Sequence, residues 1–269
     1  MVNKLLSKGY LFIVLCFLYL PILLIIVFSF SGTSTFEFTD GFNFDSYVDM
    51  IAGEKAPQLL EALKNTVVIA VISSVISTIL GSVATIGIFS MKRKTREIVE
   101  DINQLPIINS EIVMAISFLI FFATFAIPQS YVTLIIAHVA FCTPYVVLSV
   151  MPRLVAMDPN VYEAALDLGA RPIKALVKVM LPIIAPGIVS GFVMALTISL
   201  DDFIITELNK PGTFDTLSTY IYHDMRIKGM EPFWFAVFSI IFVFVLTALL
   251  LINLYNARQE KKEKEGGLK

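Results

Sequence analysis

The residues of this chain that could do chemistry are few, and several of them stand inside long apolar segments. Asp201 and Asp202 are adjacent in one such segment, while Glu111 and His138 are single ionisable residues in two others. An ionised side chain at the centre of a bilayer costs on the order of 2.5–3.5 kcal/mol on insertion scales, and less near an interface. The acids therefore either lie at helix ends, where headgroups or water solvate them, or face a polar interior.

No arrangement typical of an enzyme is present in the sequence. It has no Walker A motif, no glycine-rich phosphate loop, no nucleophile elbow and no zinc-binding HExxH motif. His138 has no second histidine, cysteine or acid at metal-ligand spacing, which is more typical of a hydrogen-bond partner between helices. Cys16 and Cys142 lie in apolar runs and have no disulfide or metal spacing. We therefore assign no catalytic residue and no metal site, and we expect any chemistry to be done by a partner.

Composition places the chain among polytopic membrane proteins. Hydrophobic residues make up 57% of the sequence and charged residues 16%, and the mean hydropathy is +0.82. These values lie well outside those of soluble domains. The net charge is −2 and the bases stand in short clusters rather than on one face, so no nucleic-acid binding is expected.

Six apolar runs are long enough to cross a hydrocarbon core of about 30 Å, and they predict an all-α protein of six transmembrane helices. The runs cover residues 10–30, 65–90, 105–125, 131–151, 183–206 and 233–255. The first is longer than the core of a cleaved signal peptide, so we expect it to be retained. The predicted organisation is an N-terminus (1–9), a transmembrane domain (10–256) and a charged, disordered tail (257–269).

The distribution of bases predicts the orientation of these spans. Lysine and arginine number 15 in the N-terminus, the 91–104 and 152–182 loops and the tail, against 5 in the other loops. By the positive-inside rule, both termini and these two loops are cytoplasmic.

Small residues recur at every fourth position in two of the runs, which predicts closely packed helix faces. The positions are Ser73, Ser77, Gly81 and Thr85 in the second run, and Gly187, Gly191, Ala195 and Ser199 in the fifth. The serines of the second run could alternatively line a path for a polar solute.

The polar stretch 158–182, between the fourth and fifth runs, is predicted to form two short helices with a break. Asp158 can cap and Pro159 can start the first helix, and Gly169 suits the left-handed residue just beyond its end. Pro172 can start the second helix, and Pro182 is expected to end it.

The first of these two helices has two distinct faces. Val161, Ala165 and Leu168 share an apolar face at i, i+4, i+7 spacing, whereas Glu163 and Asp167 form an acidic one. Such a helix can lay an apolar stripe into the groove of a partner, with acid beside it. We therefore expect the stretch to dock on another protein.

The same stretch resembles the EAA loop of the membrane subunits of bacterial binding-protein-dependent ATP-binding-cassette (ABC) importers. The residues that carry the resemblance are Glu163, Ala164, Ala165, Gly169 and the run Val179-Met180-Leu181-Pro182. Val179 departs from the isoleucine more usual in the family, but it keeps a β-branched apolar side chain. In that family the loop forms coupling helices in a groove of the ATPase, and the resemblance implies this role for Glu163 and Gly169 above all. An ordinary helix-turn-helix is the alternative.

The resemblance covers residues 8–256, and it implies an all-α fold of the type I importer (MetI-like) permease class in a bacterial plasma membrane. Asn65-Thr66 and Gly81 also look like the importer core, and the runs 138–147 and 199–206 are similar to permease subunits of spermidine/putrescine importers. The implied partners are a second, homologous permease, two copies of a cytoplasmic ATPase that uses the ATP, and an external substrate-binding protein. The resemblance implies no cofactor bound by this chain.

For a polyamine solute, the acids of the fifth run have an expected role. Asp201 shares a helix face with Ser190, Met194 and Thr197, so it can point into a water-filled path where paired negative charge favours a cation. Asp202 is closer to the small-residue face and would act through its field or by fixing helix contacts. The predicted path residues are thus Asp201, Asp202 and Thr197; the alternative is that the two acids only cap a helix end.

Two other functions fit the sequence. A permease of the same class could carry ferric iron, thiamine or an organophosphonate, because substrate choice in this class rests largely with the binding protein. A stand-alone secondary transporter or channel could use the 152–182 loop as a gate, although six spans without an obvious internal repeat argue against it.

Overall fold

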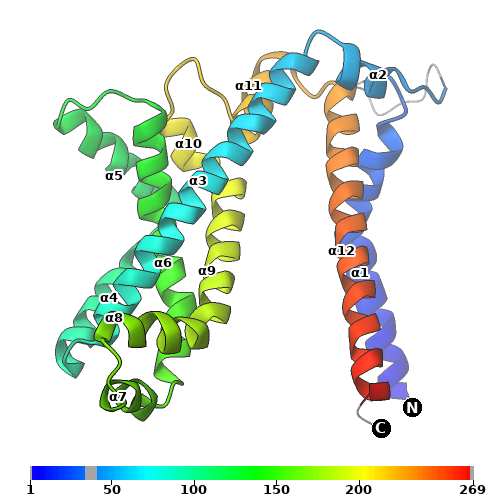
Figure 1. Cartoon of the computed structure of the whole chain (residues 1–269). Coiled ribbons are helices and arrows are strands. Elements are labelled where there is room, and N and C mark those ends of the chain that lie inside the picture. The colour runs from blue at the N-terminus through cyan, green and yellow to red at the C-terminus, as the bar shows by residue number, and fades with distance from the viewer. Residues whose placement is uncertain (1, 34–40, 267–269) are drawn as a thin grey trace. The chain divides into compact units, whose positions relative to one another are not determined.

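The computed structural model describes residues 2–33 and 41–266, and within these ranges it contains helices and no strands (Figure 1). The chain divides into two units. The first combines Met1–Leu59 with Ile221–Lys269, and the second is Leu60–Tyr220. The single transmembrane domain expected over 10–256 stays a prediction. Within the structure, the first and last long helices form one unit because α1 packs mainly on α12.

The first unit is built on an antiparallel pair of long helices, α1 (Val2–Phe28) and α12 (Pro232–Gly266), with the short α2 (Asp45–Ala52) packed on α12. In Figure 1, α1 begins and α12 ends at the same end of this pair. The tail predicted to be disordered from residue 257 continues α12 as far as Gly266. The tail is rich in glutamate and lysine, which are good helix formers, and this composition accounts for the difference.

Lys55 ties together three segments of the first unit. Its ammonium group donates hydrogen bonds to Asp224, in α11 (Leu217–Lys228), and to Glu231, just before α12. It also lies 5.3 Å from the ring centroid of Phe233 and 5.8 Å from that of Trp234. The Trp234 indole N–H donates to Asp224 over 2.7 Å, so the Asp224 carboxylate accepts hydrogen bonds from both Lys55 and Trp234. This network holds the start of α12 against the chain that leads into α3.

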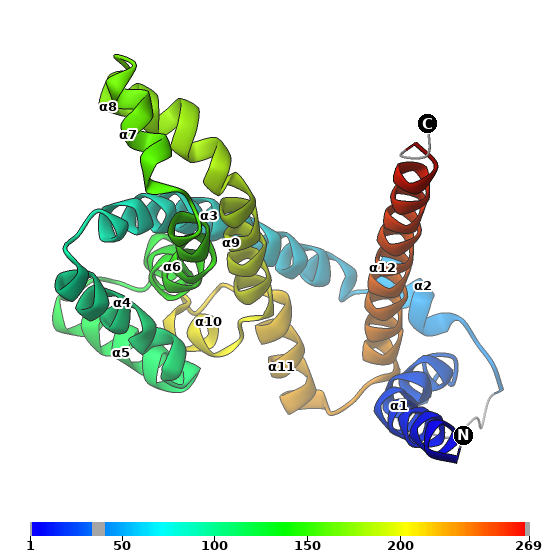
Figure 2. The same ribbon diagram turned by 90° about the horizontal axis from the view of Figure 1, so that it is seen from below.

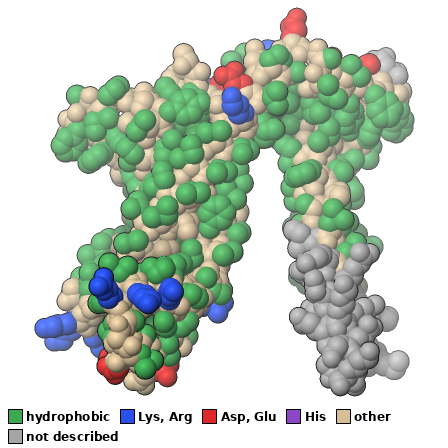
Figure 3. Space-filling model, in the orientation of Figure 1, with side chains coloured by type: hydrophobic (Ala, Val, Ile, Leu, Met, Phe, Trp, Pro, Cys, Tyr) green, Lys and Arg blue, Asp and Glu red, His purple; other side chains and the backbone are tan. Residues whose placement is uncertain are grey.

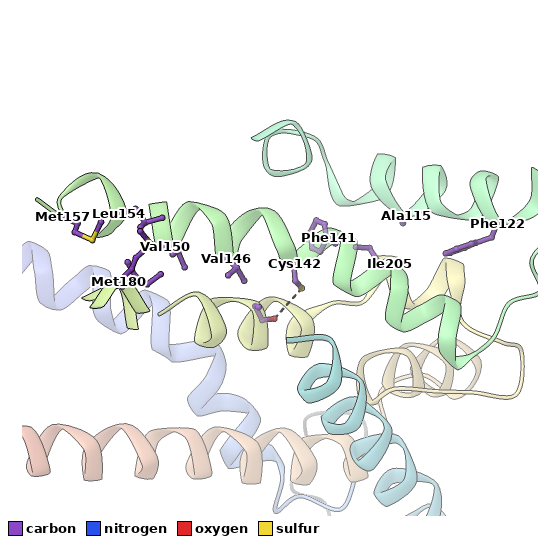
Figure 4. Close-up of a cluster of buried hydrophobic side chains, with 13 residues drawn as sticks. Ala115, Phe122, Phe141, Cys142, Val146, Val150, Leu154, Met157, Met180 and Ile205 are labelled. Carbon is purple, nitrogen blue, oxygen red and sulfur yellow. Dashed lines mark hydrogen bonds between the residues drawn. The ribbon is translucent and has the colours of Figure 1, made fainter. Parts of the chain in front are cut away.

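The second unit is arranged around α6 (Tyr131–Val155). Figures 1 and 2 show α6 among α3 (Ala56–Phe89), α4 (Arg93–Ile108), α5 (Glu111–Thr124), α9 (Leu181–Asp201) and α10 (Ile204–Asn209). More of α6 is buried than of any other candidate membrane span, 56% against 39% or less. One cluster of buried apolar side chains follows α6 along its contact with α9 and reaches α5 and α10 (Figure 4).

Both faces of small residues predicted from the sequence are confirmed as packed faces. All four residues of each set are buried in the structure. A Cβ added to Gly81 would lie 2.7 Å from Cβ of Val146, and one added to Gly187 would lie 2.8 Å from Cγ of Arg153. Side chains larger than hydrogen at these positions would push α3 and α9 away from α6, since 3.0 Å is already closer than real Cβ contacts.

The third predicted span, 105–125, is wrong as a single helix. The structure has two helices there, α4 and α5, whose axes differ by 102° across Asn109 and Ser110. Ser110 has extended backbone angles (ψ 146°), and both residues favour caps and turns over helix interiors. α4 also takes in most of the loop expected at 91–104. The described residues therefore contain five helices able to cross a membrane, or six if the bent pair counts as one span.

The fifth predicted span, 183–206, is also divided. α9 ends at Asp201, and the last residues of the run form the separate short helix α10. The break falls at Asp202 and Phe203, where Asp202 leaves the helical conformation (ψ 130°).

Close packing at Gly81 is testable with a second glycine of the same helix as control. A Cβ at Gly87 would meet nothing within 4 Å, whereas one at Gly81 would meet Val146. We expect Gly81→Ala to destabilise the protein by about 1–3 kcal/mol, the usual cost of overpacking, and Gly87→Ala to leave it unchanged or to stabilise it by up to about 1 kcal/mol. Thermal unfolding of the purified protein in detergent measures both. Because alanine has the higher helix propensity, a loss in Gly81→Ala must come from packing, and equal stability of the two variants would contradict the contact with α6.

The Lys55 network predicts a pH dependence of stability. Burial alone lowers the pKa of Lys55, but hydrogen bonds to Asp224 and Glu231 and the charges of both acids raise it above 10.5. Burial alone raises the pKa of Asp224, but hydrogen bonds from Lys55 and Trp234, with the charges of Lys55 and Lys228, bring it below 3.8. Stability from Asp224 is lost as pH falls through its folded pKa, and stability from Lys55 is lost as pH rises through its own.

We therefore expect the network's contribution to be constant from about pH 5 to 9. Asp224→Asn should lower this plateau by about 1–3 kcal/mol, because Lys55 loses a charged partner. The exposed Asp49→Asn in α2 is the matched control and should have little effect. Chemical unfolding at several pH values gives the comparison, and a plateau of the same height in Asp224→Asn would contradict the assignment.

Candidate functional site

The docking stretch, residues 158–182, begins with a capped helix, as predicted. Asp158 precedes α7 (Pro159–Asp167), and its Oδ1 accepts a hydrogen bond from the Asn160 N–H over 2.9 Å. Pro159 occupies the first helical position, where its missing N–H removes no helical hydrogen bond. Both sequence predictions for the start of this helix are confirmed.

The end of α7 is a left-handed turn at Gly169, whose φ is +84°. The Gly169 N–H donates to the Leu166 carbonyl over 2.9 Å, and the Ala170 N–H donates to the Ala165 carbonyl over 3.1 Å. These two bonds together form a Schellman motif, which satisfies carbonyls that a helix end otherwise leaves unpaired. Glycine is needed here because other residues pay a steric cost at positive φ.

The prediction that Pro182 ends the second helix is wrong. The chain passes from α8 (Pro172–Ala175) through a π-helical turn, η1 (Leu176–Met180), directly into α9. The Leu181 N–H bonds to the Leu176 carbonyl, five residues back instead of four. A proline is tolerated here because the hydrogen-bond ladder is already shifted when it reaches Pro182.

One side of the docking stretch packs on the rest of the protein, and the other side is exposed. Met157 and Met180 belong to the buried cluster along α6, and Tyr162 packs against it (Figure 4). In contrast, Leu168 is 90% exposed and Ile173 is 78% exposed. The exposed or half-buried residues also include the motif positions Glu163, Ala164, Ala165, Leu181 and Pro182. The stretch thus presents apolar and charged side chains that nothing in the described chain covers.

A second group of predicted residues lies at the break between α9 and α10. The carboxylate of Asp202 is buried, and it accepts hydrogen bonds from the N–H groups of Ile205 (3.2 Å) and Thr206 (2.8 Å). It also accepts one from the Thr206 hydroxyl over 2.7 Å. Asp202 therefore caps α10, which agrees with a role in fixing helix contacts.

His138 joins the two sides of this break. It is 1% exposed, and its Nδ1 shares a hydrogen bond of 2.8 Å with the Ser199 hydroxyl, in α9. Its Nε2 shares one of 3.0 Å with the Thr206 hydroxyl, in α10, and lies 3.5 Å from Oδ2 of Asp202. His138 is thus the hydrogen-bond partner between helices that the sequence suggested.

Asp201 and Thr197 lie on the opposite side of α9 from this network. Both side chains are exposed, as are Ser190 and Met194 on the same face. The Thr197 hydroxyl donates to the Val193 carbonyl over 2.8 Å, which leaves its oxygen free to accept a further bond. The predicted path residues are therefore separated: Asp201 and Thr197 face outward, and Asp202 is buried.

Glu111 joins the acidic group, which sequence reasoning did not foresee. It begins α5, and Asp202 and Asp201 lie near enough for their charges to act on it. The Asn209 side chain donates to the Ala115 carbonyl over 3.1 Å and so holds α10 against α5. The only signal in the sequence was an acid inside an apolar run.

Within the part of the chain that the structure describes, no basic side chain balances the negative charges of this acidic group. No lysine or arginine there forms an ion pair with Glu111, Asp201 or Asp202. Nor do the described residues contain three or more histidine, cysteine or acidic side chains placed to hold one metal ion.

Comparison with known proteins shows the family of the chain. The family described as "Binding-protein-dependent transport system inner membrane component" matches residues 77–261. The spermidine/putrescine transport system permease protein PotC of Escherichia coli (strain K12) is 29% identical over 269 residues, 100% of each chain. The putrescine transport system permease protein PotI of the same strain is 29% identical over 225 residues, 80% of this chain and 78% of its own.

The fold is shared with a solved transporter. In a crystal structure of a bacterial alginate ABC transporter in complex with an alginate pentasaccharide-bound periplasmic protein, one chain superposes with a TM-score of 0.69 at 20% identity. The superposition covers 93% of this chain and 91% of that one. The family match includes both the docking stretch and the acidic break. The chain belongs to the inner membrane components of binding-protein-dependent transport systems, and it is an ABC importer permease of the all-α, MetI-like fold.

Proposed function

We propose that this permease carries polyamines, such as spermidine and putrescine, across the bacterial plasma membrane. The acidic group formed by Glu111, Asp201 and Asp202 is the observation that carries the proposal. A polyamine has several ammonium groups separated by methylene chains, so it gains from carboxylates that are near one another but not convergent on a point. The names of the PotC and PotI relatives support the same solute class.

Within this group the residues have different roles. Asp201, Glu111 and Thr197 are exposed in the single chain and form the surface that meets the solute. Asp202 positions them, because its carboxylate holds the start of α10 and through it the contact with α5. His138 supports Asp202 from α6.

The energy for transport comes from a partner in this proposal. The chain has no nucleotide-binding motif, and the docking stretch fits a groove of a cytoplasmic ATPase, two copies of which hydrolyse the ATP. A second permease and an external substrate-binding protein complete the complex. The charge bias of the loops supports a cytoplasmic position for both termini and for the docking stretch.

A permease for another solute is the second candidate. Ferric iron, thiamine and organophosphonates differ from polyamines in charge or in coordination, and an anionic organophosphonate would be repelled by three uncompensated acids. Family membership argues against a stand-alone secondary transporter, since the family is named for dependence on a binding protein.

Neutralising the exposed acids tests the solute class. We expect Asp201→Asn and Glu111→Gln to lower polyamine uptake about tenfold each, since a charged hydrogen bond is typically worth 1.5–3 kcal/mol. Asp45→Asn, an exposed acid of α2, is the control and should not change uptake. Uptake of labelled spermidine by proteoliposomes with ATP at the ATPase side gives the rates. Normal uptake by the double variant would refute the proposal.

The Gly169 turn tests the docking assignment separately from the solute. A Cβ there meets nothing within 4 Å, so Gly169→Val acts through backbone strain alone, about 1–2 kcal/mol or more for a β-branched residue. We expect weaker binding of the ATPase and lower uptake, with normal membrane insertion. Gly212→Val is the control, because Gly212 also has open space around it but no positive φ. Copurification of the ATPase is the measurement, and equal retention by both variants would contradict the assignment.

A further inference from the structure

The docking stretch separates its charges completely. Residues 158–169 contain three acids and no base, and residues 170–182 contain three bases and no acid. The acids are Asp158, Glu163 and Asp167, and the bases are Arg171, Lys174 and Lys178. All six side chains are exposed. The Gly169 turn lies at the boundary, so the acidic half is α7 and the basic half is α8 with η1.

The two halves form separate charged surfaces in space. Figure 3 shows Lys and Arg side chains gathered over α8 and η1, and Asp and Glu side chains below them on α7. Any protein that contacts both halves therefore meets two fields of opposite sign. Like charges brought together at an interface cost affinity, whereas opposite charges speed association and fix the register.

The basic half also has exposed apolar side chains between its bases. Ile173 is 78% exposed and Val177 is 52% exposed. With Pro172 and the three bases they line an open hollow of about 760 Å³. A segment that fills it would need apolar side chains between acidic ones.

We infer that the basic half of the docking stretch binds an acidic, partly apolar segment of the cytoplasmic ATPase, while the acidic half faces basic residues of the same subunit. This inference rests on the proposed function, in which the stretch docks on that ATPase. The opposed charges favour one orientation of docking, because turning the loop end for end would place like charges together.

Two observations favour one protein partner over the anionic surface of the bilayer. Leu168, which is 90% exposed, and Ile173 stand on either side of the Gly169 turn, so exposed apolar side chains continue from one half to the other. A bilayer rich in anionic lipids would attract the basic half but repel the three acids of α7.

The test is the affinity of the ATPase for the assembled permeases in nanodiscs of neutral lipid. The triple variant R171E/K174E/K178E should bind the ATPase about ten- to hundredfold more weakly, as expected for three exposed ion pairs replaced by like charges. R171Q/K174Q/K178Q should show a smaller loss, and its affinity should depend less on salt than that of the unmodified complex.

The matched control is K92E/R93E/K94E, which makes the same charge change at exposed bases just before and within α4. It should retain normal affinity. An equal loss in this control would show that general charge, and not the docking stretch, governs association, and would overturn the inference.

The remaining outcomes separate this inference from the proposed function. If Gly169→Val weakens ATPase binding and the charge variants do not, docking stands but the opposed-charge inference fails. If none of these variants weakens it, the docking assignment fails as well. A last outcome concerns lipid. Anionic lipid in the nanodiscs could raise ATP hydrolysis by the unmodified complex but not by R171E/K174E/K178E, while the variant keeps its ATPase affinity. The basic half would then contact lipid, and the inference would be overturned.

Discussion

The buried carboxylate of Asp202 is the interaction on which the arrangement of this permease depends. α9 ends at Asp201, so the first N–H groups of α10 have no helical carbonyl to bind, and Asp202 accepts hydrogen bonds from two of them. In a membrane, unpaired backbone groups and an unpaired carboxylate would each be costly. Because His138 bonds on both sides of the break, α6 holds α9 and α10 together. A broken helix is stable here because the hydrogen bonds of Asp202 and His138 pair polar groups on both sides of the break.

A continuous packed core joins this break to the docking stretch. Met157 and Met180 lie at one end of the cluster along α6, and Ile205 of α10 lies toward the other end, with Ala115 and Phe122 of α5 beyond it (Figure 4). Close-packed interiors do not deform continuously, so a displacement of the docking stretch moves packed helices instead of being absorbed locally. The π-helical turn η1 belongs to the docking stretch and leads directly into α9, and its shifted hydrogen bonds make it the natural point of adjustment.

The sequence predicted features that follow from the chemistry of neighbouring residues. It missed those that depend on the direction of helix axes and on how helices pack. Gly169 was predictable because a helix end with a left-handed residue strongly favours glycine, and the packed face containing Gly81 was predictable from its four-residue period. The bend at Ser110 was not, because hydropathy measures how apolar a run is and not where its axis points. The approach of Glu111 to Asp201 depends on how α5 packs on α10, which no local pattern encodes.

Two exposed acids limit what can surround this chain in a membrane. Asp201 and Glu111 are uncovered in the described chain, and hydrocarbon does not accommodate two ionised carboxylates beside interrupted helices. Irregular backbone at membrane depth is stable only where protein buries it or where it borders water. We therefore expect the face of α9 that carries Thr197 and Asp201 to border water or protein instead of lipid, and the proposed second permease and solute path would satisfy this requirement together.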